Sequence, residues 1–205
     1  MKRILLFILS VSLISACSMP ETKIYSIYLF APSVPPDIRE VRADETNTRS
    51  VVILMNCPRY LAQPYIAYRN SPYQLEISRY SKWESPPGDI VKEAFKNYFS
   101  SSVVFKEVRA SSVVPEGFYS FEINLKKFER YDQGNDSYGE LDYDIKVYSP
   151  DSKELYRATV LKKVKLDNKT FLSLAQVLSS ALSESIKEVT GSLDEAVNNY
   201  ICCHE

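Results

Sequence analysis

Strict alternation of apolar and polar side chains between residues 138 and 148 is the feature that most limits how this chain can fold. Leu141, Tyr143, Ile145 and Val147 alternate with Asp142, Asp144, Lys146 and Tyr148. A two-residue period places the first set on one face of a β-strand and the second set on the other. The segment therefore predicts a sheet with one buried face and one solvated face.

Further strand-like segments surround this one. Phe118–Tyr131 precedes it and Glu154–Leu166 follows it, and residues 132–136 and 149–152 between them are rich in turn formers. The three segments predict an antiparallel meander. Earlier strands are predicted at Ile24–Phe30, Val51–Met55 and Val103–Val108, of which Val51–Met55 has the continuous apolar composition of a central buried strand.

Two segments have helical periodicity. Ser85 and Pro86 resemble a helix start, and apolar residues at helical spacing follow them, so a helix is predicted over Pro86–Ser101. A longer apolar stripe predicts a second helix that begins near Thr170. Gly191, followed by Ser192 and Glu195 at capping-box spacing, leaves open whether this helix breaks and restarts. The predicted fold class is α/β of the α+β kind, with two main helices packed on a mixed, largely antiparallel sheet.

The stretch from Pro58 to Pro87 is unusually rich in tyrosine, arginine and proline. Tyr65–Arg69 and Gln74–Ser78 read as the two strands of a hairpin joined by turn-forming residues. Binding surfaces favour tyrosine, tryptophan and arginine, although sheets favour aromatic residues as well. The candidate partner-binding residues are Tyr65, Tyr68, Arg69, Tyr80 and Trp83.

The N-terminus has the pattern of a bacterial lipoprotein signal. Lys2 and Arg3 precede the apolar run Ile4–Ile14, which as a helix would span roughly 16 Å and is too short to cross a bilayer. The run ends in Ile-Ser-Ala-Cys, which resembles a lipobox. We expect residues 1–16 to be the signal peptide and Cys17 to carry acyl chains such as palmitate, the alternative being an unmodified cysteine. Two or three chains would anchor the protein stably.

These features divide the chain into three parts. The signal peptide is followed by residues 17–50, which hold the lipidated anchor, the first strand and a proline-rich, charged linker, and by a domain over residues 51–205. About six residues separate Cys17 from the first predicted strand, a reach of at most ~20 Å. Ser18 favours the periplasmic face of the outer membrane over the inner membrane.

The composition argues against catalysis and against nucleic-acid binding. The only histidine, His204, is next to the C-terminus, and phosphate-binding and dinucleotide-binding glycine motifs are absent. Asp142 and Asp144 read as a solubilising pair. The net charge of −1 offers no basic excess for nucleic acid. We therefore expect a protein that is not an enzyme and has no cofactor or metal.

Cys57, Cys202 and Cys203 remain once Cys17 is assigned to lipidation. In an oxidising compartment Cys57 could pair with Cys202 or Cys203. A free tail is the second alternative. Metal binding by the four contiguous tail residues is the third, because their geometry is poor for a tetrahedral site.

The central stretch, taken with the lipobox, resembles the ABC-type transport auxiliary lipoprotein (PqiC-like) family. The matching pattern is P-x-Y-L, I-x-Y-R and Y-x-x-W-x-x-P, and its residues are Pro58, Tyr60, Leu61, Pro64, Ile66, Tyr68, Arg69, Leu75, Tyr80, Trp83 and Pro86. The long linker Ala31–Ser50 and the C-terminal cysteines depart from the family.

The resemblance implies a fold similar to the TolB amino-terminal domain. It also implies a periplasmic lipoprotein that works with an MCE-domain protein in moving lipid between membranes. A homo-oligomeric ring is compatible with the resemblance. The rival interpretation is a structural outer-membrane lipoprotein that serves as an assembly or secretion accessory.

Overall fold

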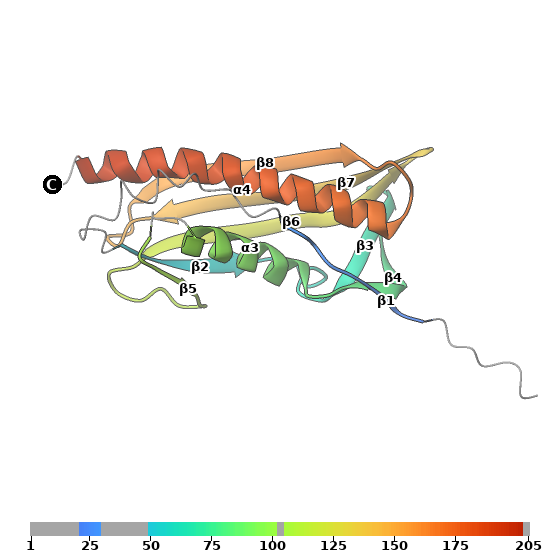
Figure 1. Ribbon diagram of the computed structural model, residues 1–205, viewed down its shortest axis with the longest axis horizontal. Helices are drawn as coiled ribbons and strands as arrows, with labels where there is room; N and C mark the ends of the chain where they lie inside the picture. The colour runs from blue at the N-terminus through green and yellow to red at the C-terminus, as the bar shows by residue number, and fades with distance from the viewer. Residues whose placement is uncertain (1–20, 30–48, 102–104, 203–205) are drawn as a thin grey trace, which may run out of the picture.

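The computed structural model is built on three long antiparallel strands, β6 (Tyr119–Gln133), β7 (Asp136–Tyr148) and β8 (Glu154–Lys165), of which β8 is at one edge of the sheet (Figure 1). They form the predicted meander. In the register Tyr143 of β7 lies between Leu125 of β6 and Val160 of β8, and all three side chains are buried. The alternation in β7 therefore predicted the buried face correctly.

The other edge of β6 is shared by two shorter strands. β2 (Ser50–Asn56) runs parallel to the first half of β6, and β3 (Tyr65–Ser71) runs parallel to its second half. β5 (Glu107–Ala110) continues the sheet beyond β2, and β4 (Gln74–Trp83) and β1 (Lys23–Tyr25) continue it beyond β3. The described residues thus form an eight-stranded mixed sheet whose long pairings are antiparallel and whose short pairings are mostly parallel.

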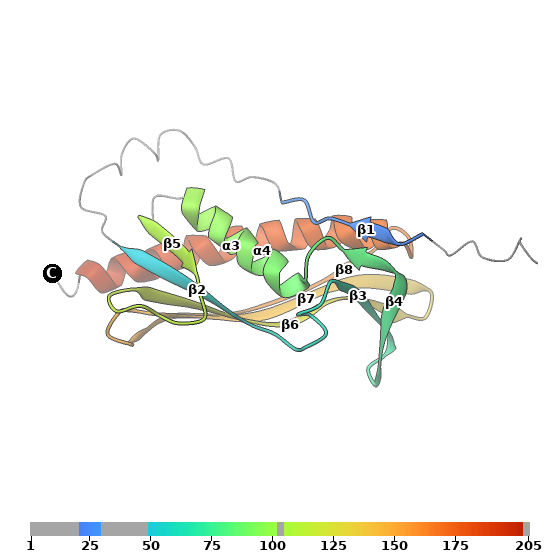
Figure 2. The same ribbon diagram turned by 90° about the horizontal axis from the view of Figure 1, so that it is seen from below.

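Two helices cover one face of this sheet (Figure 2). α3 (Pro87–Ser101) lies over β2 and β5, and α4 (Phe171–Cys202) lies over β7 and β8. Their apolar faces meet the buried face of the sheet, where Phe95, Phe121 and Tyr143 pack with ring centroids 5.0 to 6.0 Å apart. The opposite face of the sheet is not covered by either helix.

The structure describes residues 21–29, 49–101 and 105–202. The predicted signal peptide, Cys17, most of the linker and Cys203 lie outside these ranges. Within them, no helix is both long enough and apolar enough to cross a membrane.

Several boundaries differ from the prediction. α3 begins at Pro87, β1 is shorter than expected, and the strand predicted from Val103 is β5, which begins only at Glu107. α4 does not break at Gly191. The Ser192 hydroxyl donates to the carbonyl of Glu188, one turn earlier, and the helix continues through both residues.

Candidate functional site

The predicted hairpin exists and is longer than its sequence pattern indicated. β3 and β4 extend away from the body of the molecule beyond β6 (Figure 2). Its tip presents Tyr73, which is 96% exposed, and β4 presents Tyr80 at 53%. The hairpin therefore carries exposed aromatic side chains, as a binding element would.

Trp83 does not belong to that exposed surface. It is 2% exposed and packs edge-on against Phe128 with ring centroids 5.4 Å apart. Trp83 is the last residue of β4 and is part of the buried core, so a partner could reach its indole only by opening the domain. Its role in the described structure is packing.

The remaining predicted residues face different surroundings. Tyr65 is half-buried beside Lys82, whose ammonium lies 6.0 Å from the ring centroid. Tyr68 and Arg69 are consecutive on β3, so they point to opposite faces of the sheet. Tyr68 meets Arg130 on the helix-covered side, while Arg69 meets Glu129 on the open side. The five candidates therefore do not form one continuous surface.

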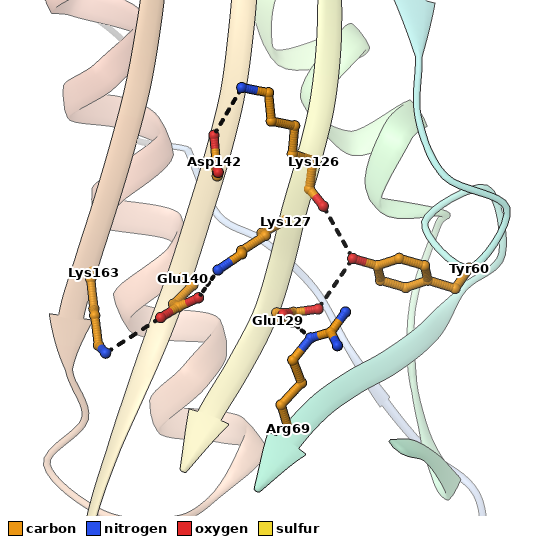
Figure 3. A network of polar contacts seen from close by, with 8 residues as sticks. All are labelled: Tyr60, Arg69, Lys126, Lys127, Glu129, Glu140, Asp142 and Lys163. Carbon is orange, nitrogen blue, oxygen red and sulfur yellow. Dashed lines mark hydrogen bonds and ion pairs between the residues drawn. The ribbon is translucent and has the colours of Figure 1, made fainter. Parts of the chain in front are cut away.

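A polar network centred on Glu129 lies on the open face (Figure 3). Glu129 is fully buried, and its carboxylate accepts a 2.6 Å bond from Nε of Arg69. The Tyr60 hydroxyl lies 3.2 Å from the same carboxylate and 3.1 Å from the carbonyl of Lys126. Arg69 thus neutralises a buried carboxylate on β6, and the Tyr60 hydroxyl lies against it.

The position of this network follows from a bulge in β6. The pairing of β6 with β7 shifts register between Leu125 and Lys127, at the point where β2 leaves β6 and before β3 joins it. On the opposite edge neither β2 nor β3 pairs with Lys126, and the Tyr60 hydroxyl, from the loop between these strands, lies 3.1 Å from the Lys126 carbonyl.

Both bulge lysines make ion pairs across the open face (Figure 3). Lys126 lies 2.7 Å from Asp144 and 3.7 Å from Asp142, and Lys127 lies 2.7 Å from Glu140. Lys163 on β8 approaches the same Glu140 at 3.5 Å. Asp142 and Asp144 therefore act in ion pairs and do not form an acid–base pair.

The electrostatics of the network favour a structural role. Burial, and secondarily the charge of Glu129, raise the pKa of Tyr60 to about 12, so its hydroxyl stays protonated at neutral pH. A protonated tyrosine between a carboxylate and a carbonyl can donate a hydrogen bond, but it is not an activated nucleophile. The network holds the two short strands against β6.

A groove lies at the end of the molecule where α4 begins. We define it by two adjoining hollows, both lined by Tyr80, Arg130 and Phe171. The Arg130 guanidinium packs between the rings of Tyr68 and Phe171, 5.0 and 4.9 Å from their centroids. One side of the groove is therefore a cation held between aromatic rings.

Arg130 is held in place by Asp132. Asp132 is 5% exposed and accepts bonds from Ser137 at 2.6 Å and from Arg130 at 3.2 Å, with the Lys169 ammonium 2.9 Å away. Burial opposes ionisation, but the Ser137 and Lys169 bonds hold the pKa of Asp132 below its ordinary value. The carboxylate therefore stays charged and fixes both cations beside the groove.

The family model described as the ABC-type transport auxiliary lipoprotein component matches residues 33–190, most of the chain. The chain belongs to this family. Among curated proteins, no significant match exists.

Solved structures share the fold of this auxiliary lipoprotein component. Protein XCC0632 of Xanthomonas campestris, of family DUF330, is 17% identical and superposes with a TM-score of 0.70, covering 86% of this chain and 98% of its own. An uncharacterised protein is 13% identical and superposes with a TM-score of 0.63, covering 84% and 99%. At these identities the similarity establishes the fold alone.

The cysteine pairing in this auxiliary component stays a prediction. Among described cysteine side chains Cys57 is free, and it lies beside the start of α3, where its sulfur is 3.0 Å from the position a side chain on Gly88 would occupy. Tyr200, near the end of α4, contacts Asp151 in the turn between β7 and β8. That turn is at the end of the sheet away from Cys57, so the placement does not favour a bond to the tail. The described residues also contain no cluster of metal-binding side chains.

Sequence reasoning missed Glu129, at the centre of the network on the open face, and the Arg130–Asp132 pair beside the groove. The available signal was in β6, where apolar residues alternate up to Leu125 and the next apolar residue, Phe128, is three positions later instead of two. Such a slip in the two-residue period is typical of a bulge. The family pattern did contain Tyr60 and Arg69, which contact Glu129.

Proposed function

We propose that this auxiliary lipoprotein component is tethered to the outer membrane through lipidated Cys17 and serves an MCE-type, ABC-linked system that moves lipid between membranes. The match to the family over residues 33–190 carries this proposal. The system is expected to supply transport and energy, while this chain supplies a docking surface.

The exposed part of the hairpin is the proposed docking surface. Tyr73 at its tip is 96% exposed and Tyr80 is 53% exposed, on an element that extends beyond the core. Large, rigid aromatic side chains on such an element can enter a pocket on a partner with little loss of side-chain entropy. Tyr65 lies on the same hairpin, whereas Trp83 is excluded by its burial.

Affinity purification of the full-length tagged protein from detergent-solubilised envelopes tests the proposal. An MCE-domain protein is expected in stoichiometric amount among the co-purified proteins, identified by mass spectrometry. A Tyr73→Ser variant should lower its recovery about tenfold, since loss of a central aromatic contact is commonly that large.

Tyr28→Ser is the matched control, because Tyr28 is 77% exposed and lies outside the hairpin. It should leave recovery unchanged. Reproducible absence of MCE proteins, with another envelope complex present, would reject the transport assignment and favour an assembly or secretion accessory. Equal recovery with both variants would reject the hairpin as the docking surface.

A further inference from the structure

The groove beside Arg130 has the charge expected of an anion site. Its lining residues include four cations, Lys23, Arg79, Arg130 and Lys169, against two carboxylates, Glu21 and Glu76. With the buried carboxylate of Asp132, which pairs with Arg130 and Lys169 behind the groove, the cations still outnumber the carboxylates by one. Glu76 is itself engaged by the amide of Asn70 at 2.7 Å. The surplus of positive charge is local, since the whole chain has a net charge of −1.

Arg130 makes the groove a preformed site. It is 6% exposed, although it lines both hollows, and its position is fixed by two aromatic rings and Asp132. A guanidinium has five N–H donors. Nη2 and Nε of Arg130 lie 3.2 and 3.1 Å from the Asp132 carboxylate, and Nη1 lies a long 3.4 Å from the carbonyl of Lys169, which leaves N–H groups on Nη1 and Nη2 for another acceptor. A buried, oriented cation with donors to spare is suited to a phosphate or carboxylate.

Exposed cations and aromatic surfaces complete the site. The side chain of Lys169 is 58% exposed and Lys23 is exposed on β1, so both can reach a bound anion. Tyr25 and Tyr80 line the same hollow. Rings beside the anion site offer a surface to the glycerol and first methylene groups of an amphiphile.

The groove lies close in sequence to the proposed membrane anchor, which favours a membrane lipid as its ligand. Glu21 lines the groove and is only four positions after Cys17 in the sequence. Four residues extend at most about 14 Å. If Cys17 is acylated, as the proposed function requires, the groove therefore lies within reach of the membrane's headgroup layer.

We propose that this groove binds the phosphate-bearing headgroup of a membrane lipid, with Arg130 as the buried contact and Lys23 and Lys169 as the exposed ones. The inference rests on the proposed membrane tether. The headgroup would fix the orientation of the domain on the membrane, in addition to the tether at Cys17.

Thermophoresis of the full-length lipoprotein in a nonionic detergent tests this inference. The probes are dihexanoyl phosphatidylglycerol, dihexanoylglycerol, which has the same acyl chains and no phosphate, and inorganic phosphate. Saturable binding of the phosphatidylglycerol alone is expected. The double variant Lys23→Gln, Lys169→Gln should weaken it about fivefold, as two partly screened charge contacts would.

Lys187→Gln, an exposed substitution on α4 outside the groove, is the control and should bind as the unmodified protein does. Equal binding of dihexanoylglycerol, or no saturable binding of any probe, would overturn the proposal. Inorganic phosphate binding as tightly as the lipid would overturn the lipid assignment. Because no transport partner is present, failure here is distinct from failure of co-purification.

Discussion

At the scale of single residues, the most demanding group is the fully buried carboxylate of Glu129. Removing a carboxylate from water costs several kcal/mol, and a partner must offset that cost. Arg69 does so at 2.6 Å, and the Tyr60 hydroxyl adds a donor. The burial of Glu129 therefore depends mainly on β3, which carries Arg69, and on the loop before it, which carries Tyr60.

Replacement of Arg69 by alanine should lower the free energy of unfolding by about 3–5 kcal/mol, because it leaves the Glu129 charge buried without a partner. Adding Glu129→Gln should restore part of that loss. Urea denaturation measures both effects. Arg157→Ala is the control: its pair with Glu154 is largely exposed, so it should change stability by less than about 1 kcal/mol. Equal losses for Arg69 and Arg157 would contradict this account.

The pKa of Tyr60, raised to about 12 by burial and by Glu129, predicts a stability change in alkali. Its ordinary value of 10 applies in the unfolded chain, so between pH 10 and about 12 the folded state holds the proton more tightly. The free energy of unfolding should fall as pH rises through this window. Tyr60→Phe should reduce that fall, measured by denaturation at each pH. An identical pH dependence in both proteins would show that Tyr60 does not contribute.

At the scale of elements, glycine has opposite consequences in β7 and α4. Gly139 faces α4, and a side chain there would lie 3.0 Å from Val177 and 3.4 Å from Leu174. Gly191 lies in the last part of α4 with open space around it. The first allows a helix to approach a strand, while the second only lowers the helical propensity of α4.

Gly191→Ala should therefore raise the free energy of unfolding by about 0.5–1 kcal/mol, since alanine loses less backbone entropy in a helix. The same substitution at Gly139 should lower it, because Val177 and Leu174 would have to move. Thermal or urea unfolding of the two variants provides the comparison. A stabilising Gly139→Ala would show that the contact between β7 and α4 can relax at little cost.

At the scale of the whole molecule, the sequence predicts the strands and helices that have a periodic pattern. It does not predict contacts between residues that are far apart in the sequence. The alternation in β7 and the stripe in α4 are local patterns, so the meander and both helices could be derived from them. Trp83 was predicted to bind a partner because its segment is rich in tyrosine and arginine, yet it is buried against Phe128 of β6. The partner of Glu129 is equally remote, since Tyr60 is 69 residues earlier. Such pairings arise only after the chain has folded.

The layout also predicts a gradient of local stability. β7 is paired along both edges and covered by α4, whereas β1 pairs with β4 through three residues only. Amide hydrogen exchange should therefore be slowest in β7 and fast in β1, where local opening breaks few bonds. Exchange measured by mass spectrometry tests this expectation. Protection of β1 equal to that of β7 would mean that the N-terminal segment is held by contacts beyond those described.

Part of one edge of β6 pairs with neither β2 nor β3, and this gap has a consequence for copies of the protein on the same membrane. Unpaired strand backbone is a template for a foreign strand, and that is how edge-to-edge aggregation begins. Tyr60 occupies the gap and bonds to the Lys126 carbonyl. A lipid tether, as proposed, would confine the molecules to two dimensions and make their collisions frequent. The loop that carries Tyr60 would then prevent strand pairing between neighbouring copies at this part of β6.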